Sequence, residues 1–181
     1  SYDLINQDVE KVPIGSRRLI YLPYLMGERT PHLNPNCRGV FFGLSAIHTK
    51  ADMLRAVMEG VSYSLLDCFD ILREMKVNVK EMMACGGGGK SRVWRQMLAD
   101  MYGCEVKTIK AQEGPALGVA ILAGVGAGIF PDVQTACKEF IEQDTWCQPD
   151  AAAHAYYEKG HALYQKLYQK LKDCYEDLAA L

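Results

Sequence analysis

The sequence has 181 residues, of which 49% are hydrophobic, and a formal net charge of −2. A chain of this length and composition can bury one sizeable core, so we expect a single domain spanning residues 1–181. The near-neutral charge, without a basic run or zinc-finger spacing, argues against nucleic acid as a partner.

Seven cysteines are scattered along the chain, an odd number without a C-x-x-C pair. That distribution favours reduced thiols in the cytoplasm over a disulfide framework or a metal site. The longest apolar stretch, residues 116–129, is too short and too rich in glycine to cross a bilayer, so we expect no membrane partner. The chain opens with Ser1 rather than methionine and carries no signal peptide, which suggests a piece of a longer protein.

The N-terminal part of the chain predicts a short helix followed by two strands. Residues 2–11 suit the helix, and the β-rich segments 18–25 and 38–44 suit the strands. Residues 27–36 join the strands as a long polar loop of turn-forming residues, the kind of segment in which function concentrates.

A long amphipathic helix follows, because apolar side chains recur at helical spacing up to about Met75. Thr49 supplies its N-cap, and Asp52, three residues on, supplies an acid for its first turn. Glu59 lies inside this helix near its apolar side, and periodicity alone favours a solvent-exposed acid at that position.

The stretch around which we expect the site to form is a run of four glycines, residues 86–89, between two apolar elements. Residues 77–84 predict a buried strand, and a helix is expected to open near Ser91 and stop before Gly103. Glycines remove side chains from the approach to the backbone, and a helix start offers unpaired N–H groups to an anion. Strand, glycine run and helix together indicate a ligand site.

Two basic residues support a ligand site here, and two positions rule out the best-known glycine motifs. Lys90 and Arg92 lie in the first turn, where the helix macrodipole disfavours cations, and a bound phosphate would offset that cost. A P-loop needs a glycine where the chain has Ala84, and a dinucleotide fingerprint needs one at Ser91, so neither motif is present. The alternative is a flexible tight turn with two solvated bases.

The C-terminal half predicts one strand, three helices and an irregular connector. In chain order they are a strand at 104–109, a helix of small residues at 113–128, a short helix at 131–140, the connector at 145–150 and an amphipathic helix at 151–178. Pro115 suits the first turn of the small-residue helix, and Gly118 suits the close approach of another element or a flat ligand. Glu113 is expected to cap that helix or fix a neighbouring loop. The tyrosines of the last helix and His161 are expected in the core and at its rim.

Several segments carry a family resemblance. Residues 39–44 (Gly-Val-Phe-Phe-Gly-Leu) and 52–59 resemble, position for position, the second signature of the FGGY carbohydrate kinases. Residues 22–32, which contain Gly-Glu-Arg-Thr-Pro-His, look like the version of that region found in xylulokinases. Residues 86–91 and 113–123 resemble the family's adenosine-binding segments.

The resemblance implies an α/β fold of the actin, Hsp70 and hexokinase type, in which two ribonuclease-H-like domains close on a cleft. This chain is similar to the second domain alone, which has a mixed sheet flanked by helices. In the family ATP lies on this domain, and the glycine segment contacts ribose and phosphate. The matching positions are Gly86, Gly87 and Gly88, with Ser91 where relatives often carry a nucleotide-contacting Asn or Ser. The helix from Pro115 is implied to support this site.

The resemblance also implies what lies elsewhere. Family members carry the Mg²⁺-anchoring aspartate, the catalytic base and most sugar contacts upstream of the segments matched here. We therefore assign no catalytic and no metal-binding residue to this chain, and we expect Mg²⁺ to arrive with ATP. Because phosphoryl transfer needs a positioned nucleophile, base and metal, the isolated chain is expected to be inactive.

The resemblance thus implies the ATP-binding, C-terminal domain of a kinase that forms xylulose 5-phosphate from D-xylulose. The sugar reaches it through the N-terminal domain. The first alternative is another FGGY kinase, for gluconate, ribulose or a similar sugar. A non-catalytic actin-like or Hsp70-like nucleotide-binding module is the second, and a structural interaction domain whose glycines merely pack is the third.

Overall fold

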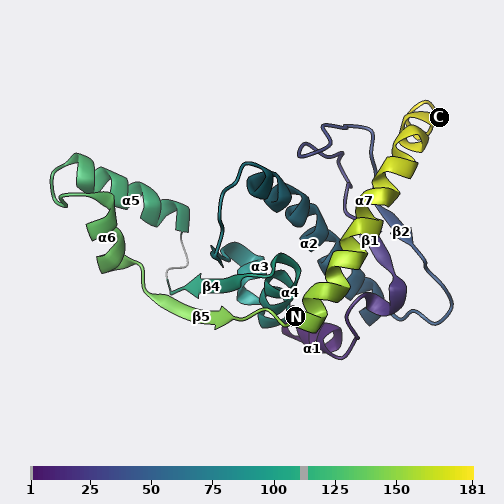
Figure 1. Ribbon diagram of the computed structural model, residues 1–181, viewed down its shortest axis with the longest axis horizontal. Coiled ribbons are helices and arrows are strands. Elements are labelled where there is room, and N and C mark those ends of the chain that lie inside the picture. Colours follow the sequence, from purple (N-terminus) through teal and green to yellow (C-terminus); the bar gives the residue numbers. More distant parts are fainter. Residues whose placement is uncertain (1, 111–113) are drawn as a thin grey trace.

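The computed structural model describes residues 2–110 and 114–181, which form a body and a projecting arm (Figure 1). The helices are α1 (Tyr2–Glu10), α2 (Lys50–Glu74), α3 (Gly86–Lys90), α4 (Arg92–Tyr102), α5 (Gly114–Gly126), α6 (Val133–Phe140) and α7 (Ala151–Ala179), with a 3₁₀ turn η1 (Ser16–Arg18). The strands are β1 (Ile20–Leu22), β2 (Val40–Phe42), β3 (Glu81–Met83), β4 (Glu105–Ile109) and β5 (Gln143–Cys147). Strands β4 and β5 lead from the body to α5 and α6 at the end of the arm (Figure 1).

Two sheets occur within the described ranges. In the first, β1 pairs antiparallel with β2. The second has the order β3-β4-β5, with β4 parallel to β3 and antiparallel to β5, so it is mixed as expected. The prediction of an irregular connector at 145–150 was wrong in its first part, because Gln143–Cys147 forms β5. Thr145 lies against Thr108 of β4 there, with 2.7 Å between their hydroxyl oxygens.

Local signals placed the helices well. Thr49 accepts a hydrogen bond from the backbone N–H of Asp52, whose side chain accepts one from Thr49, so the predicted cap is a full capping box. α2 ends next to Met75, as expected. α4 stops at Gly103, whose φ of 64° is the left-handed conformation that glycine adopts at helix ends.

Glu59, predicted to be solvent-exposed, is buried, with 2% of its surface exposed. Its carboxylate accepts hydrogen bonds from Gly15 N (2.9 Å), Ser16 Oγ (2.8 Å), Arg55 Nε (2.9 Å) and Tyr157 OH (3.0 Å). A carboxylate tolerates burial when it is paired and hydrogen-bonded in this way. The prediction failed because most of these partners come from outside α2.

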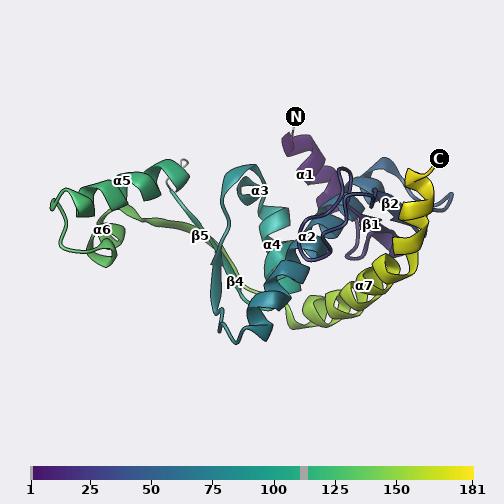
Figure 2. The same ribbon diagram turned by 90° about the horizontal axis from the view of Figure 1, so that it is seen from above.

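The core of the body lies between α2, α4 and α7, and α7 runs along the side of the body (Figure 2). Burial of the α7 tyrosines confirms the expectation from sequence; those with 6% or less of their surface exposed are Tyr157, Tyr164, Tyr168 and Tyr175. His161 is also buried, and its Nε2 lies 2.8 Å from Asp67 Oδ1 on α2. Aromatic packing and this polar contact together hold α7 on α2.

A close approach between α2 and β1 depends on one glycine. A Cβ at Gly60 would lie 2.1 Å from the carbonyl oxygen of Tyr21, a separation that real Cβ atoms do not show. The missing side chain therefore lets the helix lie directly on the strand.

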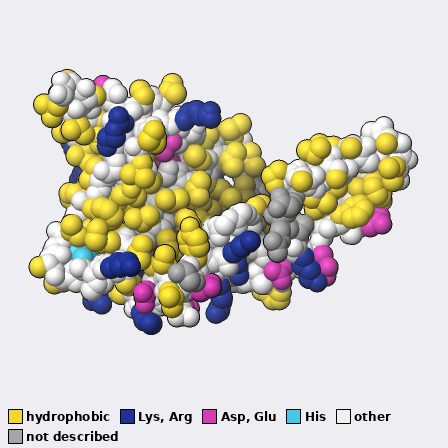
Figure 3. Space-filling view, turned by 180° about the vertical axis from the view of Figure 1, so that it is seen from behind, with side chains coloured by type: hydrophobic (Ala, Val, Ile, Leu, Met, Phe, Trp, Pro, Cys, Tyr) yellow, Lys and Arg dark blue, Asp and Glu magenta, His cyan; other side chains and the backbone are white. Residues whose placement is uncertain are grey.

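β3 lies at an edge of the mixed sheet and is shorter and more exposed than the buried strand expected over 77–84. Its Glu81 and Met83 side chains are exposed. No strand in the described part of the chain pairs with its outer edge. An apolar groove of about 430 Å³ lies beside it, and its lining includes Leu65 and Leu72 of α2. Figure 3 shows hydrophobic side chains spread over much of one face of the body and of the arm.

Of the two close approaches that Gly118 suits, that of another element is not made within the described residues. None of their atoms lies within 4 Å of the position that a Cβ would take there. Glu113, expected at the mouth of this helix, lies outside the described residues. All seven cysteines are free thiols. None of the helices in residues 2–110 and 114–181 has the length and apolar character needed to cross a membrane.

Candidate functional site

The glycine run does not form an open loop. Residues Gly86–Lys90 make the short helix α3, which begins directly after Cys85. Its backbone passes close to the end of β3, because a Cβ at Gly89 would lie 2.8 Å from the carbonyl oxygen of Ala84. Glycine at this position therefore permits a tight turn between strand and helix.

Ser91 links α3 to α4 through its side chain. Its hydroxyl accepts a hydrogen bond from Trp94 N (3.2 Å) as the N-cap of α4, which confirms the expected start of that helix. The same hydroxyl donates to Asn6 Oδ1 (2.9 Å) on α1. The Ser91 side chain thus has two protein partners and is buried.

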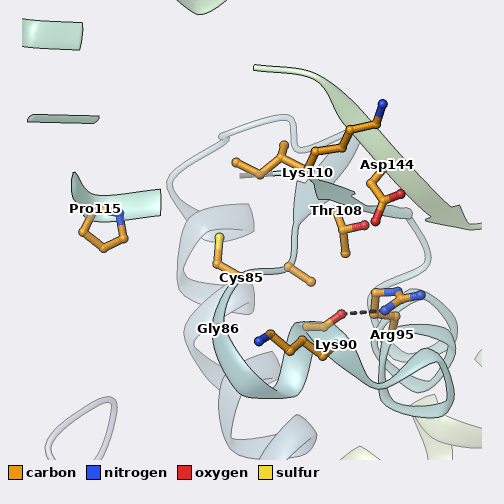
Figure 4. A pocket seen from close by; sticks show the side chains of 11 residues that line it. Cys85, Gly86, Lys90, Arg95, Thr108, Lys110, Pro115 and Asp144 are labelled. Atoms are coloured by element: carbon orange, nitrogen blue, oxygen red, sulfur yellow. Dashed lines mark hydrogen bonds between the residues drawn. The ribbon is translucent and has the colours of Figure 1, made fainter. Parts of the chain in front are cut away.

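A cavity of about 690 Å³ opens beside α3 (Figure 4). Its walls come from the end of β3, from α3, α4, β4 and β5, and from Pro115 at the start of α5. Three cationic side chains, Lys90, Arg95 and Lys110, belong to its lining. Asp144 adds one carboxylate, and Ala84, Ile109 and Pro115 supply apolar wall, so the lining has more cations than anions beside an uncharged surface.

The four predicted site residues do not all face this cavity. Gly86 lines it. Gly87 is exposed on α3, and no atom lies within 4 Å of a Cβ placed there. Gly88 faces the ring of Trp94 and lines the apolar groove instead. Ser91 is outside the cavity lining and acts in the cap described above.

Of the two basic residues in the glycine segment, one lines the cavity and the other does not. Lys90 lines the cavity, whereas Arg92 is exposed at the start of α4 and does not. Lys110, at the end of β4, forms an ion pair with Glu142, and hydrogen bonding to that carboxylate raises the pKa of the lysine. The charge of Lys110 is thus compensated by Glu142, and Lys90 is the base of the glycine segment that adds positive charge to the cavity.

Arg95 is one of the cavity residues that sequence reasoning missed, together with Thr108, Lys110 and Asp144. It lies on α4, one helical turn after Ser91, and is 8% exposed. Its Nη1 donates a 2.6 Å hydrogen bond to the carbonyl oxygen of Gly89, drawn in Figure 4. The available signal was its spacing from Ser91, since residues four apart lie on the same face of a helix.

The described residues include no group of three His, Cys, Asp or Glu side chains arranged to hold a metal ion. The cavity does suit a nucleotide: its volume lies within the range of about 300–1,000 Å³ common for small-molecule sites, and its cations suit phosphate.

Comparison with known proteins gives the relatives of this chain. Residues 3–127 match the family model described as "FGGY family of carbohydrate kinases, C-terminal domain". The chain is 40% identical to a xylulose kinase of Staphylococcus epidermidis over 168 residues, which cover 93% of this chain and 34% of that enzyme.

Two solved structures from Lactobacillus acidophilus match closely. A ligand-bound xylulose kinase gives a TM-score of 0.91 at 32% identity, over 98% of this chain and 36% of the other. A gluconate kinase gives a TM-score of 0.90, also at 32% identity and with the same coverage of both chains. These likenesses confirm the resemblance and the predicted fold. The chain spans about a third of the length of the relatives it matches.

Proposed function

The chain belongs to the FGGY family of carbohydrate kinases, and we propose that residues 1–181 form the ATP-binding, C-terminal domain of a kinase that phosphorylates D-xylulose. The observation that carries the nucleotide part is the cavity beside α3. There a tight glycine turn meets a lining that contains Lys90, Arg95 and Lys110. ATP is the group that this combination of backbone access and positive charge suits.

We assign the nucleotide contacts to the cavity and to the glycine segment. Gly86 and Gly87 would let the ligand approach the backbone of α3. Gly88 would support them from the side of α3 that faces Trp94. Ser91 would hold the glycine segment in position for the ligand, because it ends α3 and caps α4. ATP would bring Mg²⁺ with it. The seven free thiols support a cytoplasmic setting for the kinase.

D-Xylulose is the preferred sugar because the matched relatives include xylulose kinases at 40% identity. Gluconate is the second candidate, because the gluconate kinase structure matches this chain as well as the xylulose kinase structure does. Sugar contacts would come from a domain outside this chain, so the choice between the two rests on the relatives alone.

The test uses Gly87→Val and measures ADP binding by calorimetry. The structure leaves open space at that position, so the valine can be accommodated in the fold but would obstruct a ligand approaching α3. We expect the Kd for ADP to rise by about tenfold or more, which corresponds to about 1.4 kcal/mol of binding free energy. Gly126→Val is the matched control, because it also has open space and lies at the end of α5. Unchanged ADP affinity in Gly87→Val would contradict the assignment of the glycine turn.

A further inference from the structure

Arg95 is a buried cation without a carboxylate partner. Only 8% of its surface is exposed, and within residues 2–110 and 114–181 its side chain makes one hydrogen bond, from Nη1 to the carbonyl oxygen of Gly89. Its Nε is buried and has no hydrogen-bond partner in the part of the chain that the structure describes. Asp144 lines the same cavity but forms no ion pair with it, and neither does any other carboxylate among the described residues.

The second deeply buried arginine of the body shows what is missing. Arg55 is 7% exposed and pairs with Glu59 at 2.9 Å. It also donates to two backbone carbonyls and to the hydroxyl of Tyr157. Removing a guanidinium from water is costly unless a counter-charge and hydrogen-bond acceptors replace the water. Arg55 has both, whereas Arg95 has a single neutral acceptor.

We propose that the counter-charge of Arg95 is a phosphate group of the bound nucleotide, and that Arg95 is a phosphate-binding residue of the cavity. This inference rests on the proposed function of the cavity as the ATP site. Figure 4 shows Arg95 and Lys90 on one side of the cavity, with Thr108 and Asp144 on the strands across from Arg95. The guanidinium binds phosphate oxygens through Nη2, which is not among the fully buried atoms without a partner, while the bond from Nη1 to Gly89 fixes its orientation.

A nucleotide fits the site better than a free anion does. The cavity holds about 690 Å³, far more than one phosphate needs, and Ile109 and Pro115 supply apolar wall on which a base can lie. Binding of the phosphate through Arg95 also connects the ligand to Gly89, because the same side chain contacts both. The arginine thereby couples the phosphate to the glycine turn.

The experiment compares the affinity of three probes, ADP, adenosine and inorganic phosphate, for the 181-residue chain and its variants. Arg95→Met removes the charge and keeps the aliphatic stem. We expect it to weaken ADP binding by about tenfold to a hundredfold, the effect of losing a charged hydrogen bond, and to leave adenosine binding within about threefold. Arg92→Met is the matched control, because it removes an exposed charge from the same helix outside the cavity and should leave both affinities within about threefold.

Arg95→Lys is a second variant that tests the proposal even if Arg95→Met does not fold. It keeps the positive charge but loses the planar fork, so we expect ADP affinity between those of the wild type and Arg95→Met. Melting curves by circular dichroism accompany every variant. If Arg95→Met does not fold, a preference for ADP over adenosine in Arg95→Lys as large as in the wild type overturns the proposal.

Other outcomes separate this inference from the proposed function. Equal losses of ADP and adenosine affinity in Arg95→Met would show a structural role and overturn the phosphate contact. Unchanged ADP affinity would overturn it as well, with the ATP site intact. Phosphate that displaces ADP as effectively as ADP itself would assign the cavity to a free anion. A wild-type chain that binds no adenine nucleotide would overturn the proposed function and the role of Arg95 together.

Discussion

The hydroxyl of Tyr157 on α7 donates a 3.0 Å hydrogen bond to Glu59 Oε1 on α2, across 98 residues of sequence. Both side chains are buried, with Tyr157 fully removed from solvent. Glu59 also accepts from Gly15 and Ser16, at the start of η1, where Arg17 and Arg18 have positive φ angles of 55° and 71°. One carboxylate therefore ties two helices to an otherwise unfavourable stretch of backbone.

Glu59→Ala should lower the free energy of unfolding by about 3–5 kcal/mol, because it leaves Arg55 as an unpaired buried charge. Urea unfolding followed by circular dichroism measures the change. Glu139→Ala, an exposed acid on α6, is the control and should stay within about 0.5 kcal/mol of the wild type. A loss at Glu59 no larger than at Glu139 would show that the network contributes little to stability.

Asp52 should make part of the stability depend on pH. Burial alone would raise its pKa, but hydrogen bonds from Thr49 and Arg17 outweigh burial and hold the pKa below its ordinary value of 3.8. The unfolded chain therefore binds this proton more readily. The contribution of Asp52 is present above the unfolded pKa and is lost as the pH falls through the folded one.

The measurement compares the wild type with Asp52→Asn in urea titrations at several pH values. We expect the wild type to be more stable near neutral pH, and the difference to shrink as the pH falls below about 5 and through the folded pKa of Asp52, which lies below 3.8. Asp173→Asn, at an exposed position of α7, should show no such trend. A difference between wild type and Asp52→Asn that is constant over this range would refute the linkage.

Two helical glycines should respond to alanine with opposite signs. Gly118 lies in open space on α5, so Gly118→Ala should gain about 0.5–1 kcal/mol through better helix propensity. Gly60 lies against the Tyr21 carbonyl, so Gly60→Ala should cost about 1–3 kcal/mol through overpacking. Thermal melts of both variants decide the matter. A lowered melting temperature for Gly118→Ala would mean that α5 packs more closely than the structure shows.

Supplied with MgATP and D-xylulose, the 181-residue chain should release no ADP above background. The family resemblance implies that the base and the metal-anchoring aspartate lie elsewhere, and transfer needs the two domains to close on the sugar. A coupled ADP-release assay measures turnover, with the Staphylococcus epidermidis xylulose kinase as positive control. Turnover by the chain alone would show that catalytic residues lie within it.

A chimera extends this assay. In it the chain replaces the matching residues of the Staphylococcus epidermidis enzyme, of which they make up 34%. We expect xylulose-dependent ADP release, because the chain would supply the nucleotide half of a complete cleft. A chimera that folds but stays silent, despite binding ADP, would count against the proposed role of the chain.

Sequence alone located the features whose causes are local. The cap at Thr49, the glycine stop at Gly103 and the buried tyrosines of α7 depend on residues within a few positions or on helical periodicity. The order of most elements, and the place of the glycine segment between β3 and α4, were predicted for the same reason. Such features can be predicted from sequence because the residues that cause them are close together in the chain.

Features decided by distant partners were missed. β5 is a strand because β4 lies beside it, and Gln143–Cys147 has no strict alternation of its own. The glycine run is helical although glycine disfavours helices, because Arg95 and the end of β3 hold it in place. Arg95 itself was overlooked, since neither its burial nor the absence of a carboxylate partner is visible before the elements are assembled.

The unpaired edge of β3 has a practical consequence for handling the protein. A free row of backbone donors and acceptors beside an apolar groove is a template on which a second molecule can add a strand. Three residues offer a short template, but the adjoining hydrophobic surface strengthens any such pairing. Concentrated solutions should therefore accumulate intermolecular β-structure, and Met83→Lys, at an exposed position of the strand, would be the first substitution to try against aggregation.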